Sequence, residues 1–161
     1  MVLLPLVSSQ VDVPIIAAGG FLDGATMAAG FALGAEAVQM GTRMVSSTES
    51  PVHENWKTAI VSARETDTVF LNRAHSPALR AIRTEKTTRL EFDAETNAMS
   101  EFGKATELYF GGDMEASVGL AGQTSGLIDE VKPVAEIIET MVGEFHDITG
   151  QMGRLAAEKS F

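Results

Sequence analysis

The sequence predicts an α/β fold built on parallel strands, and two short segments in its first third predict it. Val13–Gly20 and Ala37–Arg43 are apolar runs that end abruptly at or near glycine, as buried parallel strands do where they meet a ligand. One helix-length stretch, residues 23–34, separates them. This order of strand, glycine turn, helix, strand and glycine turn places two glycine-bearing loops side by side at one edge of a parallel sheet.

The segments around these strands fit a longer series of β/α units. Leu3–Val11 resembles the end of a helix, and it stands directly before a buried strand, so we expect further β/α units upstream. The helix between the two strands is rich in alanine and contains Gly30 and Gly34, which makes it thin enough to pack closely on the strands.

The middle of the chain changes character after Thr42. Ser50 and Pro51 predict a helix that runs to about Arg64, with Ser50 as the N-cap and Pro51 at the first helical position. Residues 68–71 form a strand-like run of β-branched and aromatic side chains. Residues 72–112 are predicted to be a peripheral insertion with short helices around 77–84 and 94–110.

The last third regains a helical pattern. Asp113 is predicted to cap a helix that ends near Leu120, and a second helix is predicted to begin near Pro133 and to pack on the sheet. Beyond Gly150 we expect the tail to fray. The predicted division is therefore residues 1–71 with the barrel strands and a phosphate site, 72–112 as a helical insertion, and 113–161 as closing helices and tail.

Composition limits the classes of function. The chain has 161 residues, 45% hydrophobic content and a mean hydropathy of +0.09, which are typical of a soluble globular protein. No stretch predicts a membrane helix or a secretory signal, so a cytoplasmic location is expected. The net charge of −10 argues against nucleic acid or an anionic membrane as the main partner.

The side chains that bind metals or form covalent intermediates are scarce. The chain has no cysteine, which removes disulfides and thiolate sites, so any redox chemistry must come from a bound cofactor. Its three histidines, His53, His75 and His146, lie far apart and form no metal-ligand spacing. No metal site is therefore expected.

The two glycine-ended loops are the candidate site. Gly19 and Gly20 allow the backbone to approach a ligand with its N–H groups free, and we expect the positive end of the helix that follows them to attract an anion. Gly41 and Thr42 add further N–H groups and a hydroxyl. In (β/α)8 barrels a phosphate site recurs at the loops after the last two strands, so the fold we predict is the C-terminal portion of such a barrel, carrying its last two strands.

Four segments together resemble the flavin-dependent nitronate monooxygenases, once called 2-nitropropane dioxygenases, and the related flavin-dependent enoyl-acyl-carrier-protein reductases. They are Pro14–Phe21, Gly34–Arg43, Gly122–Ile128 and Lys132–Ile138. The resemblance implies that FMN is the cofactor and that its phosphate is held by a set of residues from both loops: Gly19, Gly20, Gln39, Met40, Gly41 and Thr42. For Arg43 we expect a structural role in a salt bridge.

The same resemblance places the catalytic histidine of the family upstream of these segments. None of the three histidines of this chain fits that motif, so no catalytic residue is assigned and all three are expected to be structural or surface residues. The implied activity is oxidation of nitronates or nitroalkanes with dioxygen. Two alternatives stay open: an enoyl-acyl-carrier-protein reductase, and a non-catalytic fragment that binds FMN or phosphate. The expected partners are a small-molecule substrate and either a second copy or a missing N-terminal barrel half.

Overall fold

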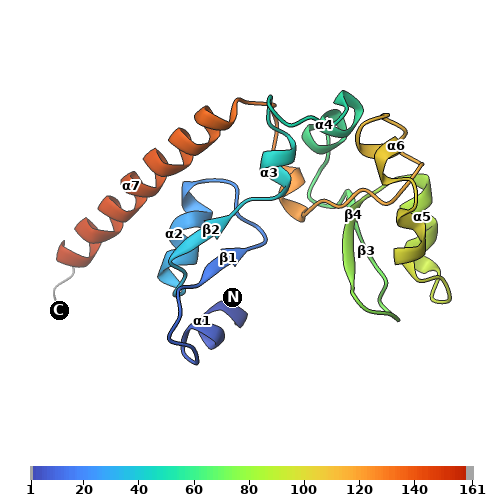
Figure 1. The fold of residues 1–161 in the computed structure, drawn as a ribbon. Helices are drawn as coiled ribbons and strands as arrows, with labels where there is room; N and C mark the ends of the chain where they lie inside the picture. Colours follow the sequence, from blue (N-terminus) through green and yellow to red (C-terminus); the bar gives the residue numbers. More distant parts are fainter. Residues whose placement is uncertain (1, 159–161) are drawn as a thin grey trace. The chain divides into compact units, whose positions relative to one another are not determined.

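The computed structural model describes residues 2–158, which divide into two compact units. The first, here called the strand unit, comprises residues 2–40 and 133–158, and the second, the insertion unit, comprises residues 41–132. Figure 1 shows both units, coloured along the chain. The division into 1–71, 72–112 and 113–161 stays a prediction.

The strand unit has the predicted order of helix, strand, helix and strand, followed by a long C-terminal helix. Its strands β1 and β2 pair in parallel, with Ile16 opposite Ala37 and Ala18 opposite Gln39. Its elements are α1 (Leu3–Ser8), β1 (Ile16–Ala18), α2 (Gly24–Ala32), β2 (Ala37–Gln39) and α7 (Val134–Glu158). Both strands are shorter than the apolar runs that predicted them.

Helix α2 is fixed at its start by a capping box. Asp23 accepts a hydrogen bond from the Thr26 N–H at 2.8 Å, and the Thr26 hydroxyl accepts one from the Asp23 N–H at 3.2 Å. The expected close packing is present at Gly30, where a Cβ would stand 2.7 Å from the ring of Phe21 and 3.3 Å from Val38. The small residues of α2 thus allow it to lie directly on β2.

The prediction placed helix α7 on the sheet, but in the structure α7 packs on α2. Ile137 and Met141 are buried, and the rings of Phe31 and Phe145 lie 5.2 Å apart. Residues 151–158 continue α7 instead of leaving it, although every side chain there is exposed, as expected; the last part of the predicted tail, residues 159–161, lies outside the described residues. Residues 151–158 contain leucine, arginine, alanine and glutamate, which favour a helix even without packing.

The insertion unit contains an antiparallel hairpin and several short helices. Strands β3 (Thr68–Leu71) and β4 (Leu79–Ile82) pair with Phe70 opposite Arg80, and β3 has the predicted bounds. A core formed by Val69, Leu71, Ala81, Ala98 and Val118 lies at the hairpin. The helices are α3 (Thr42–Val45), α4 (Glu54–Val61), α5 (Glu85–Phe92), η1 (Ala98–Phe102), α6 (Ala105–Tyr109) and η2 (Gln123–Leu127).

Three helix predictions in this unit were wrong. Residues 79–82 form β4 instead of a helix, because the turn at Asn72, which has a φ of 65°, returns the chain alongside β3. Asp113 starts a turn, not a helix: its carboxylate accepts from the Glu115 N–H at 3.0 Å. Helix α4 begins at Glu54 with His53 as its N-cap, so Ser50 and Pro51 lie outside it.

The chain enters and leaves the insertion unit along two neighbouring segments. Ser47 and Lys132 form an isolated parallel bridge, and the Thr48 N–H donates to the Lys132 carbonyl at 2.9 Å. Residues from the beginning and the end of this unit are therefore hydrogen-bonded to each other.

Candidate functional site

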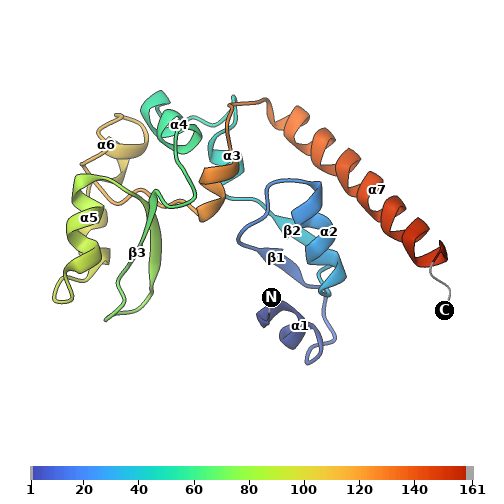
Figure 2. The same cartoon turned by 180° about the vertical axis from the view of Figure 1, so that it is seen from behind.

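The parallel pairing of β1 and β2 brings four of the predicted site residues to the C-terminal end of the two strands. Because Ala18 and Gln39 are register partners, Gly19 and Gly20 follow β1 at the same edge where Met40 follows β2. Figure 2 shows the two strands side by side from behind. Gly19, Gly20 and Gln39 are exposed, and Met40 is half-buried.

The glycine turn after β1 has a backbone that other residues rarely adopt. Gly19 has a φ of 96° and Gly20 a φ of 90°, both in the left-handed region. A Cβ added at either glycine would meet nothing within 4 Å. No hydrogen bond among residues 2–158 uses the N–H of Gly20. The turn therefore offers an open stretch of backbone, with a free donor, that suits an oxyanion.

The first turn of α2 does not serve this site as we expected. The Gly24 N–H donates to the Glu144 carboxylate of α7 at 2.9 Å, and the Thr26 N–H donates to Asp23. The positive end of the helix is thus neutralised by two carboxylates of the chain itself. Nothing in the local sequence links Glu144 to Gly24, which lies 120 positions away in the chain.

Gly41 and Thr42 belong to the insertion unit. Of the apolar run Ala37–Arg43 only Ala37–Gln39 is a strand, and residues 42–45 form the single helical turn α3 where a glycine loop was predicted. Within the insertion unit the Thr42 hydroxyl accepts a hydrogen bond from the Gly122 N–H at 2.9 Å. Two segments that the sequence singled out, 34–43 and 122–128, therefore meet at Thr42, whose hydroxyl proton is still available to donate.

Arg43 has a structural role, through hydrogen bonds to a backbone carbonyl and a hydroxyl; the predicted salt bridge stays a prediction. Its side chain is buried, and its guanidinium Nη1 donates to the Glu130 carbonyl at 2.8 Å and lies 3.4 Å from the Ser46 hydroxyl. Arg43 thereby ties α3 to the segment that leads out of the insertion unit.

The three histidines occupy structural or surface positions. His53 caps α4, where its Nδ1 accepts from the Asn55 N–H at 3.1 Å. His75 Nε2 lies 3.2 Å from the Ala94 carbonyl, and His146 is exposed on α7. Among residues 2–158 no three His, Asp or Glu side chains gather in a way that could hold a metal ion. No helix in this range is long and apolar enough to cross a membrane.

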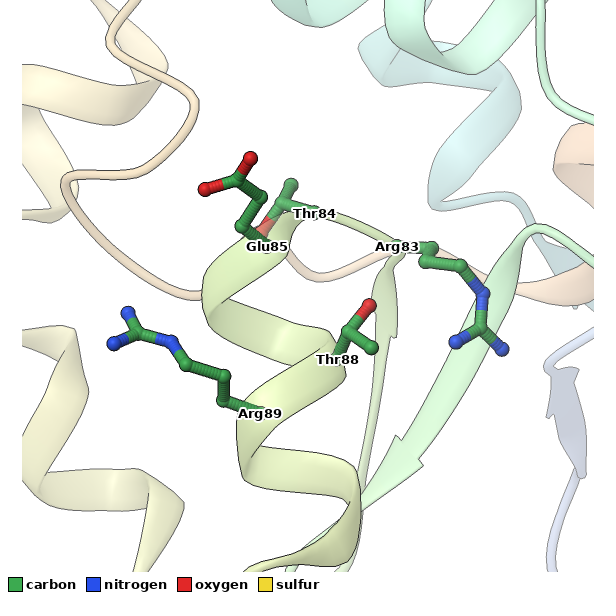
Figure 3. Close-up of a pocket in the computed structure, with 5 residues that line it drawn as sticks. All are labelled: Arg83, Thr84, Glu85, Thr88 and Arg89. Carbon is green, nitrogen blue, oxygen red and sulfur yellow. The ribbon is translucent and has the colours of Figure 1, made fainter.

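A pocket on α5 is the second place that we inspected for an anion site. It is lined by Arg83, Thr84, Glu85, Thr88 and Arg89, but Figure 3 shows the two guanidinium groups directed to opposite sides of the helix. The backbone N–H groups of Glu85 and Lys86 already bind the Glu115 carboxylate, at 2.9 and 2.7 Å. The groups that could hold an anion here are thus dispersed or already paired.

The strand unit also contains an apolar groove, here called the α1–β1 groove. It has a volume of about 430 Å³ and is lined by Leu3, Leu4 and Val7 of α1, residues 15–19, Phe21 and Leu33. It runs beside β1 and ends at Gly19, so it adjoins the glycine turn.

Comparison with known proteins gives consistent results. A family model described as "Nitronate monooxygenase" matches residues 1–144. A probable nitronate monooxygenase from Staphylococcus saprophyticus is 42% identical over 85 residues, which are 53% of this chain and 24% of that protein. One from Staphylococcus aureus is 46% identical over 68 residues, which are 42% of this chain and 19% of that protein.

Two solved structures have the same fold over nearly the whole chain. FabK from Thermotoga maritima has a TM-score of 0.89 and 42% identity, covering 96% of this chain and 51% of that one. A nitroalkane oxidase from Streptomyces ansochromogenes has a TM-score of 0.74 and 25% identity, covering 93% of this chain and 44% of that one. The chain thus spans about half the length of these solved structures, and its matches cover a quarter or less of the curated relatives.

Proposed function

The chain belongs to the nitronate monooxygenase family, and from that premise we propose that it binds FMN and serves the oxidation of nitronates or nitroalkanes by dioxygen. The observation that carries the proposal is the open glycine turn at Gly19 and Gly20, beside the end of β2. When bound, FMN supplies the redox chemistry that the side chains of the chain lack.

The proposed role of the chain is to hold the phosphate end of FMN. Gly19 and Gly20 donate backbone N–H groups, and Gln39 and Met40 lie at the same sheet edge. The resemblance of the sequence to the family adds Gly41 and Thr42, which follow directly along the chain. Backbone donors and a hydroxyl suit a dianionic phosphate, because each forms a charge-assisted hydrogen bond.

We propose that the two strands are the last two of a (β/α)8 barrel, and that the catalytic histidine lies on the part of the barrel that this chain does not span. The parallel pair with its connecting helix supports this architecture, as does the coverage of about half of the solved relatives. The proposed substrates are small molecules, and the proposed location is the cytoplasm.

A second candidate function is that of a flavin-dependent enoyl-acyl-carrier-protein reductase. FabK is a flavin-dependent enoyl-acyl-carrier-protein reductase. This chain is 42% identical to it but only 25% identical to the nitroalkane oxidase, and this difference favours the second candidate. Assays on a complete barrel containing this chain separate the two functions. Oxygen consumption with a nitronate supports the first, and NAD(P)H oxidation with an enoyl thioester supports the second. Turnover with neither would support the third candidate, a fragment that binds FMN or phosphate without catalysis.

The cofactor proposal can be tested by comparing FMN with riboflavin, which has the same ring but no phosphate. If the glycine turn binds the phosphate, fluorescence titration of the full chain will show FMN binding at least tenfold more tightly than riboflavin. The Gly20→Ala variant should lose this preference, because it places a methyl group in the cradle. Gly103→Ala is the matched control: a Cβ there also meets nothing within 4 Å, and its φ of −54° is ordinary. Equal affinity for the two flavins would refute the proposal.

A further inference from the structure

We propose that residues 122–125 of the insertion unit orient the Thr42 hydroxyl as a hydrogen-bond donor to the FMN phosphate, and that Ser125 is the positioning residue, acting through Gly122. The inference rests on the proposed function, because it takes FMN as the ligand. It goes beyond that function by assigning a role in cofactor binding to a segment that lies 80 positions after Thr42 in the chain.

The Thr42 hydroxyl accepts one hydrogen bond and donates none within the described part of the chain. The Gly122 N–H donates to its oxygen at 2.9 Å, whereas no group of residues 2–158 accepts its proton. The bond from Gly122 occupies one lone pair of the oxygen, which restricts the direction of the hydroxyl proton, and it polarises the O–H bond. A phosphate dianion offers only acceptors, so it is a ligand that suits such a hydroxyl.

The backbone on both sides of Gly122 is held in place. Before it, the Ala121 N–H donates to the Arg80 carbonyl of β4 at 3.2 Å. After it, the Gly122 carbonyl accepts from the Ser125 N–H at 3.1 Å and from the Ser125 hydroxyl at 2.9 Å. The Ser125 side chain is fully buried, so bulk water does not compete for this bond. Ser125 therefore fixes Gly122, which in turn orients the Thr42 hydroxyl.

The next residue of α3 is tied to the same stretch of the insertion unit. Arg43 Nη1 donates to the Glu130 carbonyl at 2.8 Å, so α3 is attached to residues 122–130 at two consecutive positions. Two attachments fix the rotation of a short helical turn as well as its position. Thr42 is thus held in its orientation before a ligand arrives, which lowers the entropic cost of binding.

Fluorescence titration of the full chain with FMN and with riboflavin tests the role of Ser125. Ser125→Ala removes one hydrogen bond to Gly122, so the preference for FMN over riboflavin should fall by about threefold to tenfold, with the affinity for riboflavin unchanged. Ser117→Ala is the matched control, because Ser117 is equally buried in the same unit and its hydroxyl donates to the Glu101 carbonyl at 3.3 Å. It should keep the preference. Urea denaturation of both variants separates a loss of stability from a loss of preference.

Two variants of Thr42 and one NMR signal test the hydroxyl itself. Thr42→Val removes the hydroxyl at nearly the same volume and should lower the preference for FMN, whereas Thr42→Ser retains the hydroxyl and should keep most of it. In the parent chain, FMN should shift the Gly122 amide proton downfield, because a hydroxyl that donates to phosphate becomes a stronger acceptor. Riboflavin should leave this signal unchanged. A bond with a purely structural role would respond to neither flavin.

The inference is overturned if either Ser125→Ala or Thr42→Val keeps the preference of the parent chain for FMN, or if FMN leaves the Gly122 amide proton unshifted. Each of these results would leave the cofactor proposal intact, because the glycine turn could still hold the phosphate. Equal affinity of the parent chain for FMN and riboflavin would instead refute the cofactor proposal, and this inference with it.

Discussion

At the scale of single residues, the two left-handed glycines after β1 carry the most chemical meaning. A side chain at Gly20 would force an L-residue into a conformation that costs roughly 1–2 kcal/mol. We therefore expect Gly20→Ala to lower the free energy of unfolding by about that amount, as measured by urea denaturation. Gly103→Ala should stay within about 0.5 kcal/mol of the parent. Similar losses in both variants would contradict a special role of the left-handed backbone at Gly20.

A second residue-scale prediction concerns Asp67. Hydrogen bonds from the Arg64 side chain and from its backbone N–H lower the pKa of Asp67 below its usual value of 3.8. The charged carboxylate is thus favoured in the folded state, so its stabilising effect is present above about pH 4 and is lost as the pH falls through the lowered pKa. Arg64→Ala should raise the pKa of Asp67 towards 3.8 in an NMR titration. Arg73→Ala, which removes an arginine that does not affect Asp67, should leave it unchanged.

Sequence reasoning identified single residues well where the cause was local. The start of a helix at position 23 and the turn at Gly19 and Gly20 follow from neighbours within a few positions. The Glu144 carboxylate at the Gly24 N–H joins residues far apart in the chain, and no local pattern indicates it. Thr42 was predicted to lie in the loop after the second strand, whereas it starts the helical turn α3, where its hydroxyl accepts a hydrogen bond from the distant Gly122 N–H.

At the scale of elements, α7 is an amphipathic helix whose stability can be raised by replacing an interior glycine. Gly143 lies in its interior, and a Cβ there would meet nothing within 4 Å. Gly143→Ala should therefore raise the free energy of unfolding by about 0.5–1 kcal/mol, because alanine loses less backbone entropy than glycine. Gly24→Ala should do the opposite, since its Cβ would collide with Glu144 of α7. Thermal unfolding followed by circular dichroism distinguishes the two, and destabilisation by Gly143→Ala would contradict the expected entropic effect.

The elements also show where a local pattern is sufficient. Residues 68–71 were predicted with their observed bounds because β-branched and aromatic side chains dominate that run. Its partner β4 was mistaken for a helix, because Leu79, Arg80 and Ala81 favour a helix intrinsically and the pairing with β3 is tertiary. Helix α7 was found from its apolar stripe, but the stripe alone did not tell whether a sheet or a helix would cover it.

At the scale of the whole molecule, the two units differ in how much of their apolar surface is buried. The insertion unit has its own apolar core at the hairpin, whereas the strand unit leaves one sheet face and the α1–β1 groove open. We expect residues 41–132 expressed alone to give a dispersed NMR spectrum and a cooperative urea transition. Val69→Ala, which removes a fully buried side chain from that core, should abolish or sharply lower the transition, at a cost of about 1–3 kcal/mol. An NMR spectrum of residues 41–132 without chemical-shift dispersion would contradict the expectation that this unit folds on its own.

The bridge between Ser47 and Lys132 gives the insertion a further property. A module whose incoming and outgoing segments are clasped together at its base behaves like a cassette, because its interior can be lengthened, shortened or replaced while its ends keep their spacing. Changes of length inside the cassette then leave the spacing of its two ends, and the glycine turn outside it, unaltered.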